Sequence, residues 1–273
     1  MGQTILITGA SSGIGKASAL RFHAEGWNVV ATMRNPQDGE DLAALSNVLV
    51  TRLDVLDQSS IDSSVTAAVD RFGAIDVLLN NAGYGAFGPL EAFDLPGIRR
   101  QFDTNVLGLL AVTKAVLPHM RERRIGTVIN ISSVGGRMTF PLGTLYHGTK
   151  FAVEGLSEAL HFELNEIGVR VKIIEPGIIR TDFAGRSFDF RNDDSIAEYQ
   201  PFIAKTVAAF GAMAEHASEA SAVADVVFTA ATDGSSQLRY TAGNGAAELM
   251  NSRKELDDEA FIRNLRAQML GSH

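Results

Sequence analysis

A tyrosine and a lysine stand four residues apart in the segment Tyr146-His147-Gly148-Thr149-Lys150. In a helix, this spacing places both side chains on one face. A phenol has a pKa of about 10, which is too high for useful proton exchange at neutral pH. A nearby ammonium group favours the phenolate and so lowers that pKa. The pair therefore predicts a general acid/base, in which Tyr146 gives a proton to a carbonyl oxygen or takes one from an alcohol.

Two further polar positions follow predicted strands. Ser133 lies thirteen residues before Tyr146, directly after an apolar run, and Asn81 lies in Asn-Asn-Ala-Gly after an earlier run. In open α/β sheets, ligands bind at the carboxyl ends of the strands. We therefore expect the Ser133 hydroxyl to hold a substrate oxygen. Serine and asparagine are also common turn formers, so these residues support a site only together with Tyr146 and Lys150.

A glycine-rich turn, TGASSGIG over residues 8–15, separates the first predicted strand from the first predicted helix. Its glycines allow the backbone to approach a pyrophosphate closely, and the helix start directs its free N–H groups toward the anion. The position inside a β-α-β unit strengthens this interpretation. The spacing is G-x-x-x-G-x-G, which differs from the G-x-G-x-x-G dinucleotide fingerprint.

The second predicted strand ends in Ala-Thr-Met-Arg-Asn. It lacks the acidic residue that binds a ribose 2′-hydroxyl in NAD-binding units. Arg34 instead offers a planar guanidinium to a 2′-phosphate. An arginine at a strand end is also a common surface residue. Together with the glycine-rich turn, Arg34 favours NADP(H) as the cofactor, with NAD(H) as the alternative.

The elements that position these residues alternate along the chain. Short, nearly continuous apolar runs predict strands buried on both faces, and the longer amphipathic stretches between them predict helices. This alternation implies right-handed crossovers and a parallel sheet covered on both sides. The predicted fold class is α/β, a Rossmann-type doubly wound parallel sheet in a three-layer α/β/α sandwich. The predicted strands are 4–8, 28–32, 48–53, 75–79, 127–131 and 169–174, and the predicted helices are 13–24, 59–72, 98–120 and 146–165.

One domain accounts for the whole chain, 1–273, because no linker rich in proline, glycine or serine interrupts it. Residues 181–216 depart from the alternation, since they mix aromatic and charged residues without a clear strand. We expect a mobile substrate flap there, over the carboxyl edge of the sheet, with an irregular surface connection as the alternative. Residues 220–231 and 238–240 predict a further helix and strand, and residues 255–270 predict a C-terminal helix.

Composition narrows the function classes. Hydrophobic residues make up 45% of the chain and charged residues 21%, which is ordinary for a globular protein. The net charge of −8 disfavours nucleic acid and anionic membranes as partners. There is no cysteine, and the six histidines lack paired ligand spacing, so no metal site is expected. The N-terminal residues lack a signal-peptide pattern and no run is long enough to span a membrane, so we expect a cytoplasmic protein.

The motifs T-G-x-x-x-G-x-G, N-N-A-G, a serine thirteen positions before the tyrosine, Y-x-x-x-K and P-G-x-x-x-T occur in order. Over about residues 4–181 the chain therefore resembles the short-chain dehydrogenase/reductase family. The resemblance implies that Tyr146 is the general acid/base, and that Lys150 lowers its pKa and binds the nicotinamide ribose. It also implies that Ser133 positions the substrate oxygen and that Asn105 supports a proton-relay water.

The resemblance further implies a set of cofactor contacts. Asp54 corresponds to the acid that contacts the adenine, Asn81 to the residue beside the adenosine ribose, and Thr181 to the residue that contacts the carboxamide. The implied cofactor-binding residues are Gly9, Ser11, Ser12, Gly13, Ile14, Gly15, Arg34, Asp54, Val55, Asn81, Ala82, Gly83, Tyr146, Lys150, Pro176, Gly177, Ile179 and Thr181.

The residues Ala-Thr-Met-Arg after the second strand resemble those of the 17β-hydroxysteroid and retinol dehydrogenase kind within the family, which implies a sizeable apolar substrate. Tyr-His-Gly-Thr-Lys departs from the commoner Tyr-x-Ala-Ser-Lys. Gly148 weakens the start of the helix, and His147 receives no catalytic role. The candidate substrate-pocket residues near the catalytic edge, each of which would also suit plain packing, are Phe87, Val134, Leu142 and Phe183.

The sequence therefore predicts hydride transfer between NADP(H) and a small-molecule ketone, aldehyde or alcohol. The alternative is an NADP(H)-sensing protein without turnover, which needs the glycine-rich turn and Arg34 but not the whole catalytic set. The glycine spacing disfavours a sugar-nucleotide epimerase or dehydratase. The resemblance also implies a homodimer or homotetramer that pairs through the helix carrying Tyr146. The apolar positions of that helix, which would equally pack onto the sheet, are Val153, Leu156 and Leu160.

Overall fold

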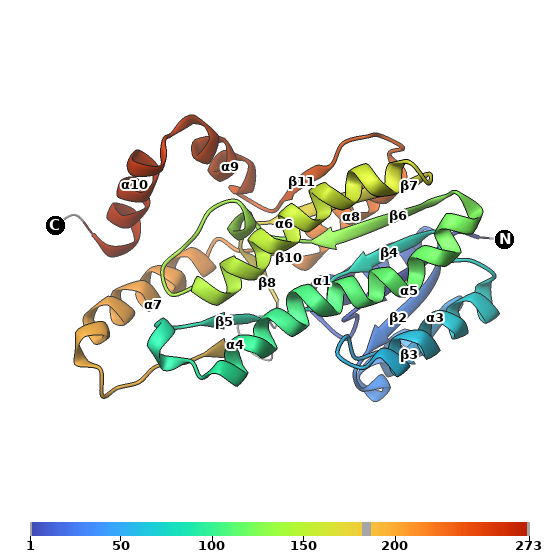
Figure 1. The fold of residues 1–273 in the computed structure, drawn as a ribbon, viewed down its shortest axis with the longest axis horizontal. Coiled ribbons are helices and arrows are strands. Elements are labelled where there is room, and N and C mark those ends of the chain that lie inside the picture. Colours follow the sequence, from blue (N-terminus) through green and yellow to red (C-terminus); the bar gives the residue numbers. More distant parts are fainter. Residues whose placement is uncertain (1, 182–186, 272–273) are drawn as a thin grey trace.

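In the computed structural model, which describes residues 2–181 and 187–271, seven parallel strands form the central sheet (Figure 1). The strand order is β11-β7-β6-β4-β1-β2-β3. From β1 the chain first builds the sheet outward through β2 and β3, and then on the other side of β1 through β4, β6, β7 and β11. This arrangement confirms the predicted Rossmann-type sheet. The strands are β1 (Thr4–Thr8), β2 (Asn28–Met33), β3 (Val48–Arg52), β4 (Val77–Asn80), β6 (Gly126–Ile131), β7 (Val169–Pro176) and β11 (Arg239–Ala242).

Helices cover both faces of the sheet, which confirms the three-layer sandwich. Successive side chains of β1 point to opposite faces of the sheet and so enter two apolar cores. Ile5 and Ile7 pack in one core with Phe22, and Leu6 packs in the other with Val112. One face carries α1 (Gly13–Ala24) and α8 (Ala220–Thr232), and the other carries α3 (Gln58–Phe72), α5 (Gly108–Arg123) and α6 (Thr144–Asn165); the short α2 (Glu40–Ala43) follows β2.

The predicted helix over residues 98–120 is present, but it is not α-helical throughout. The structure has α4 (Leu95–Phe102), a π-helical turn over Asp103–Leu107, and then α5. A π turn adds a residue to the helix circumference and often occurs at functional sites. Here it contains Asn105, whose buried side chain bonds to residues outside the helix. Helical periodicity alone does not reveal that local widening.

The segment 181–216 is more regular than the sequence suggested. Phe188–Phe190 form β9, which pairs in parallel with β5 (Gly85–Phe87), and Gln200–Ala214 form the helix α7. Ion pairs hold β9 in place, since Arg100 reaches Asp189 at 2.5 Å. The prediction that this segment has no clear strand was therefore wrong. The strand is hard to recognise in the local sequence because its partner, β5, lies about a hundred residues earlier in the chain. Phe183 lies outside the described residues.

The chain ends in two helices, α9 (Ala246–Glu255) and α10 (Asp258–Leu270). The C-terminal helix begins three residues later than predicted, because Asp257 caps it by accepting the Ala260 N–H at 2.8 Å. In Figure 1, α7 and α10 lie beyond the end of the sheet toward which the β6 arrow points. The remaining short strands, β8 (Ile179–Arg180) and β10 (Ser218–Glu219), pair with each other.

None of the helices that the structure describes is both long and apolar enough to cross a membrane. The cytoplasmic location stays a prediction.

Candidate active site

The structure brings the predicted catalytic tyrosine and serine together. Ser133 follows β6, and Tyr146 lies in the first turn of α6. The Ser133 hydroxyl lies near enough to the Tyr146 phenol to influence its pKa. Burial raises the pKa of Tyr146 above its usual value, and the Ser133 hydroxyl acts in the opposite direction. The phenol is therefore protonated at neutral pH.

Lys150 lies one helical turn beyond the tyrosine on α6. Its Nζ donates a hydrogen bond to the Ile131 carbonyl at 2.8 Å and lies 5.8 Å from the centroid of the Tyr146 ring. Burial lowers the pKa of Lys150 to about 8, and the negative charge of Glu154 opposes that shift. The ammonium thus stands on the same helix face as the phenol, as the spacing predicted.

Asn105 joins three segments of the chain at the π turn. Its Oδ1 accepts the Tyr84 N–H at 3.0 Å, and its Nδ2 donates to the Tyr84 carbonyl at 2.8 Å. Nδ2 also lies 3.1 Å from the hydroxyl of Thr149, the neighbour of Lys150. The side chain is 2% exposed. Asn105 therefore fixes the loop after β4 against the helix that carries the catalytic pair.

The glycine-rich turn is packed so tightly that side chains are excluded. A Cβ on Gly15 would lie 2.3 Å from the Gly9 carbonyl oxygen. Gly9 itself has φ 69°, the left-handed region that favours glycine. Asn81 holds the turn from β4, because its Nδ2 donates to the carbonyls of Thr8 and Gly9 at 2.9 and 3.1 Å. The two motifs recognised separately in the sequence form one structure.

The first turn of α1 suits an anion. Its N-cap residue, Ser12, makes no side-chain capping bond, so the first N–H groups of the helix have no side-chain acceptor at that position. Beside it, a Cβ on Gly13 would lie 3.3 Å from the Thr181 side chain. Thr181 of the P-G-x-x-x-T motif therefore lies beside the glycine-rich turn, and its contact with the carboxamide stays a prediction. The predicted residues that complete this turn are Ser11, Ile14, Ala82 and Gly83.

The predicted adenosine-binding residues follow neighbouring strands. Arg34 is exposed directly after β2, and Asp54 follows β3, which pairs with β2. The Asp54 carboxylate accepts the Leu56 N–H at 3.0 Å, and Val55 packs against Gly108 at the start of α5. On the other side of the sheet centre, β7 ends at Pro176, whose carbonyl accepts the Ser133 hydroxyl at 3.5 Å. Gly177 and Ile179 follow it.

Aromatic rings line the catalytic side of the β5–β9 pair. The Phe87 ring lies 5.2 Å from the Tyr146 ring and 5.2 Å from the Phe188 ring, measured between centroids. Phe210 of α7 approaches Phe87 edge-on at 6.1 Å. Val134 packs in a cluster with Met250 and Phe261 of the C-terminal helices, and Leu142 is 7% exposed. The substrate contacts of Phe87, Val134 and Leu142 stay predictions.

The sequence profile of the family described as short chain dehydrogenase matches residues 3–192. The chain belongs to this family. An uncharacterized oxidoreductase of Schizosaccharomyces pombe is 46% identical over 242 residues, which cover 87% of this chain and 99% of the relative. Retinol dehydrogenase 8 of Homo sapiens is 37% identical over 193 residues, covering 67% of this chain and 61% of the relative.

Solved structures support the same assignment. A short-chain dehydrogenase of Streptomyces avermitilis has a TM-score of 0.82 at 33% identity, covering 96% of this chain and 97% of that one. A variant of actinorhodin polyketide ketoreductase, solved with NADPH, has a TM-score of 0.76 at 27% identity, covering 90% of this chain and 97% of that one. This chain is therefore an oxidoreductase of the short-chain dehydrogenase family.

Sequence reasoning missed several side chains around the site of this short-chain dehydrogenase. His147 is 3% exposed and bonds through both ring nitrogens, although its position beside Tyr146 received no catalytic role. Glu154, one turn after Lys150, is also buried, at 4% exposure. Phe188 alternates with Phe190 across an aspartate, a period-two pattern that is typical of a half-buried strand. That pattern was the sequence signal from which β9 could have been predicted.

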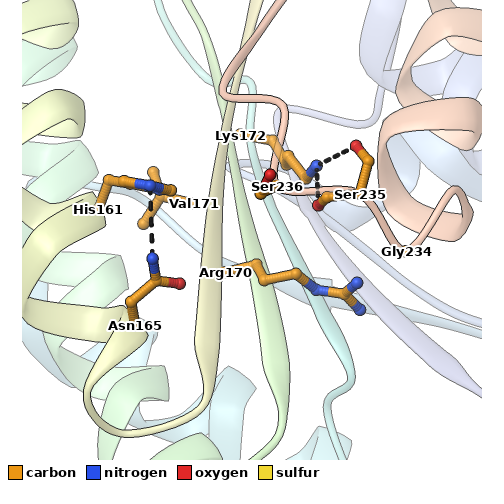
Figure 2. A pocket seen from close by; sticks show the side chains of 8 residues that line it. All are labelled: His161, Asn165, Arg170, Val171, Lys172, Gly234, Ser235 and Ser236. Atoms are coloured by element: carbon orange, nitrogen blue, oxygen red, sulfur yellow. Dashed lines mark hydrogen bonds between the residues drawn. The ribbon is translucent and has the colours of Figure 1, made fainter.

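A second set of polar side chains lies at the opposite end of the sheet (Figure 2). His161 and Asn165 near the end of α6, Lys172 in β7 and Ser235 line a cavity of about 130 Å³. Lys172 bonds to Ser235 on one wall, and His161 lies near Asn165 on the other (Figure 2). These groups are near the amino-terminal half of β7, whereas Ser133 contacts its carboxyl end. The cavity therefore has no part in the catalytic arrangement.

Proposed function

We propose that this protein is an NADP(H)-dependent oxidoreductase that interconverts a ketone or aldehyde with an alcohol, with Tyr146 as general acid/base. One observation carries the proposal: the Lys150 ammonium lies 5.8 Å from the centroid of the Tyr146 ring and is bonded to the last residue of β6, the strand that Ser133 follows. The packed glycines of residues 9–15, where a Cβ would fill the cradle, fit a dinucleotide phosphate.

NADPH, when bound, supplies the hydride that reduces the carbonyl carbon. The hydroxyl of Ser133 and the phenol of Tyr146 hold the carbonyl oxygen by hydrogen bonds. The Tyr146 proton passes to that oxygen as the C–O double bond becomes a single bond, and the resulting phenolate is stabilised by the ammonium of Lys150. In the oxidative direction Tyr146 accepts the proton of the alcohol. Asn105, which is fixed between Tyr84 and Thr149, supports the water that restores the proton to the tyrosine.

The preference for NADP(H) over NAD(H) rests on Arg34. It follows β2 directly, at the strand end where NAD-binding units place an acidic residue. A guanidinium pairs with a 2′-phosphate through two parallel charge-assisted hydrogen bonds, whereas it gains little from a ribose hydroxyl. The ketoreductase that shares this fold is solved with NADPH, which agrees with this preference.

A sizeable apolar substrate agrees with the aromatic wall formed by Phe87, Phe188 and Phe210. The names of two relatives point the same way. One is retinol dehydrogenase 8, and the other is a 3-ketodihydrosphingosine reductase of Bacteroides thetaiotaomicron, 41% identical over 181 residues. The substrate-pocket role of Phe87 and Leu142 belongs to this proposal.

A homodimer or homotetramer also belongs to the proposal. Val153 is 1% exposed and packs inward, so the outer face of α6 is formed instead by Phe151 and Phe162, at 45% and 70% exposure. Leu107 beside α5 is 57% exposed. Large apolar side chains in such numbers on two neighbouring helices are typical of a protein interface. Size-exclusion chromatography with light scattering tests it, and a monomer at micromolar concentration would contradict it.

The cofactor assignment is tested by calorimetric titration of the wild type and of Arg34→Ala with NADPH and NADH. We expect NADPH to bind more tightly, and we expect the substitution to weaken NADPH binding about 10- to 100-fold while leaving NADH binding nearly unchanged. Arg52→Ala is the matched control, because Arg52 ends the neighbouring strand β3 and pairs with Asp57 at 2.9 Å. NADH binding that equals NADPH binding and ignores Arg34 would overturn the preference.

Turnover separates the enzyme from the sensing protein. We expect NADPH oxidation with a panel of bulky apolar ketones and aldehydes, followed at the nicotinamide absorbance. Tight NADPH binding without turnover on any member, together with a protein partner whose binding depends on the cofactor, would favour the alternative of an NADP(H)-sensing protein.

A further inference from the structure

His147 uses both of its ring nitrogens in a buried position. Its Nδ1 lies 2.8 Å from the Gly135 carbonyl oxygen, and the Phe140 N–H points at its Nε2 over 3.0 Å. A carbonyl only accepts and a backbone N–H only donates, so Nδ1 carries the proton and Nε2 does not. The two bonds together require the neutral imidazole. Burial, the larger effect, lowers the pKa of His147, and this favours the same form.

Glycines make room for the ring on both sides. A Cβ on Gly135 would lie 2.7 Å from His147 Nδ1, and a Cβ on Gly143 would lie 2.4 Å from its Cδ2. The ring also packs against the rings of Phe87 and Phe140, with centroids 6.1 and 5.7 Å away. The loop 133–143 therefore surrounds the imidazole on several sides.

The loop held in this way begins with the catalytic serine. The Ser133 hydroxyl accepts the Gly135 N–H at 2.9 Å, so the residue whose carbonyl binds His147 also orients Ser133. At the other end of the loop, Leu142 has φ 63°, a strained conformation for a residue other than glycine. Such strain persists only where neighbouring contacts determine the backbone. The His147 N–H bond to the Gly143 carbonyl, at 2.8 Å, is one of these contacts.

We propose that His147 is a positioning residue: its neutral imidazole, with the proton on Nδ1, ties the loop 133–143 to α6 and so holds the Ser133 hydroxyl against the Tyr146 phenol. His147 does not exchange protons with the substrate. It acts on Ser133 through Gly135. Because His147 directly follows Tyr146 in the chain, it links the position of Ser133 to that of Tyr146. This inference rests on the proposed function, because it assigns His147 a part in the same reaction.

A double-mutant cycle with Ser133 tests the proposal. In the wild-type background, His147→Ala is expected to lower kcat about 100-fold, since a displacement of about 1 Å in a catalytic group has an effect of that order. Asn at this position retains a donor near the place of Nδ1, so His147→Asn is expected to recover part of the loss. In the Ser133→Ala background, His147→Ala is expected to lower kcat by no more than about twofold, because the two residues act in one chain. NADPH binding is expected to change little.

His161→Ala is the matched control, because His161 lies on the same helix at the far end of the sheet, near Asn165. It is expected to leave kcat unchanged in both backgrounds. Multiplicative losses in the double mutant, or an equal loss in His147→Asn and His147→Ala, would overturn the positioning role. Circular dichroism and NADPH titration identify a variant that fails to fold, and the Asn variant then takes its place in the cycle.

A second readout does not depend on turnover. The Ser133 hydroxyl lowers the pKa of Tyr146, so displacing Ser133 is expected to raise that pKa. Carbon-13 NMR of the tyrosine Cζ, with Tyr146→Phe to assign the signal, is expected to show the same upward shift in Ser133→Ala, in His147→Ala and in the double variant. A wild type without turnover would contradict the proposed function, whereas an unshifted Tyr146 titration in His147→Ala would contradict the role of His147.

Discussion

Two lysines, each beside a tyrosine, lie at opposite ends of the same sheet. Lys172, in the amino-terminal half of β7, is 1% exposed. Its Nζ donates to the carbonyls of Ser235 and Gln237 at 2.8 Å each and to the Tyr240 hydroxyl at 2.9 Å. The Tyr240 hydroxyl in turn donates to Asp233 at 2.6 Å. Each proton of the Lys172 ammonium therefore has an acceptor. Burial and the hydrogen bond to Asp233 raise the pKa of Tyr240 to about 12.

Lys150 has a much poorer set of partners. Within the part of the chain that the structure describes, its Nζ donates one hydrogen bond, to the Ile131 carbonyl. In the proposed function, the remaining donors bind the ribose of the cofactor. The comparison teaches that residue type does not separate a structural lysine from one with a proposed catalytic role. What separates them is whether the protein itself satisfies the donors, and at which end of the strands they stand.

The largest contrast is expected from removing the two phenol hydroxyls. Tyr146→Phe is expected to lower kcat about 1,000-fold, because the general acid is lost, while the free energy of unfolding changes little. Tyr240→Phe is expected to keep kcat and to lower the free energy of unfolding by about 1–2 kcal/mol, because Lys172 and Asp233 each lose a partner. Steady-state kinetics and urea unfolding measure the two effects. Near wild-type turnover in Tyr146→Phe would contradict the catalytic assignment.

Replacing the two lysines is expected to give the same contrast between a loss of activity and a loss of stability. Lys150→Met is expected to reduce kcat/KM about 100-fold without a loss of thermal stability. Lys172→Met leaves the Ser235 and Gln237 carbonyls and Asp233 short of a donor, and we expect a loss of about 3 kcal/mol, or roughly 6–12 °C in Tm. Differential scanning calorimetry and kinetics on both variants check this. A stability loss in Lys150→Met as large as that in Lys172→Met would remove the distinction between the two sites.

The smallest effect is a shift in pH dependence. Glu154 accepts from Arg239 at 2.9 Å and raises the pKa of Lys150 against the effect of burial. Loss of the Lys150 proton above about pH 8 is expected to lower kcat/KM for NADPH. Glu154→Gln keeps an acceptor for Arg239 but removes the charge, so the basic limb moves to lower pH. Glu158→Gln is the control, because Glu158 binds the same arginine at 2.6 Å from the solvent side. Equal pH profiles in both variants would contradict this reading.

The same pKa has a consequence for stability. The folded-state pKa of Lys150, about 8, lies below its ordinary value of 10.5, so between these values the unfolded chain binds more protons than the folded one. The free energy of unfolding therefore receives a contribution that grows as the pH rises from about 8 toward 10.5. Comparing urea unfolding of the wild type and Lys150→Met across this range is expected to show the slope in the wild type and a smaller one in the variant.

Local patterns were sufficient for most of the sheet and for the placement of Tyr146 and Lys150 on one helix face. The helix predicted over residues 13–24 is present with those bounds, and the strand predictions at 4–8 and 28–32 agree with β1 and β2 to within one residue. Tyr146 and Lys150 share a face because that relation is set within one turn of helix. Motif order likewise identified the family, because each motif spans only a few neighbouring residues.

The sequence by itself determined which segments become strands and helices and which residues stand at the carboxyl ends of the strands. Only the tertiary structure decided the pairing of β5 with β9, the π turn at Asn105, the bonds of His147 and the difference between Lys150 and Lys172. Periodicity reports whether a residue faces the core, but not which polar group meets it there. The partners of Lys172 lie more than sixty residues away along the chain, and no local pattern carries that information.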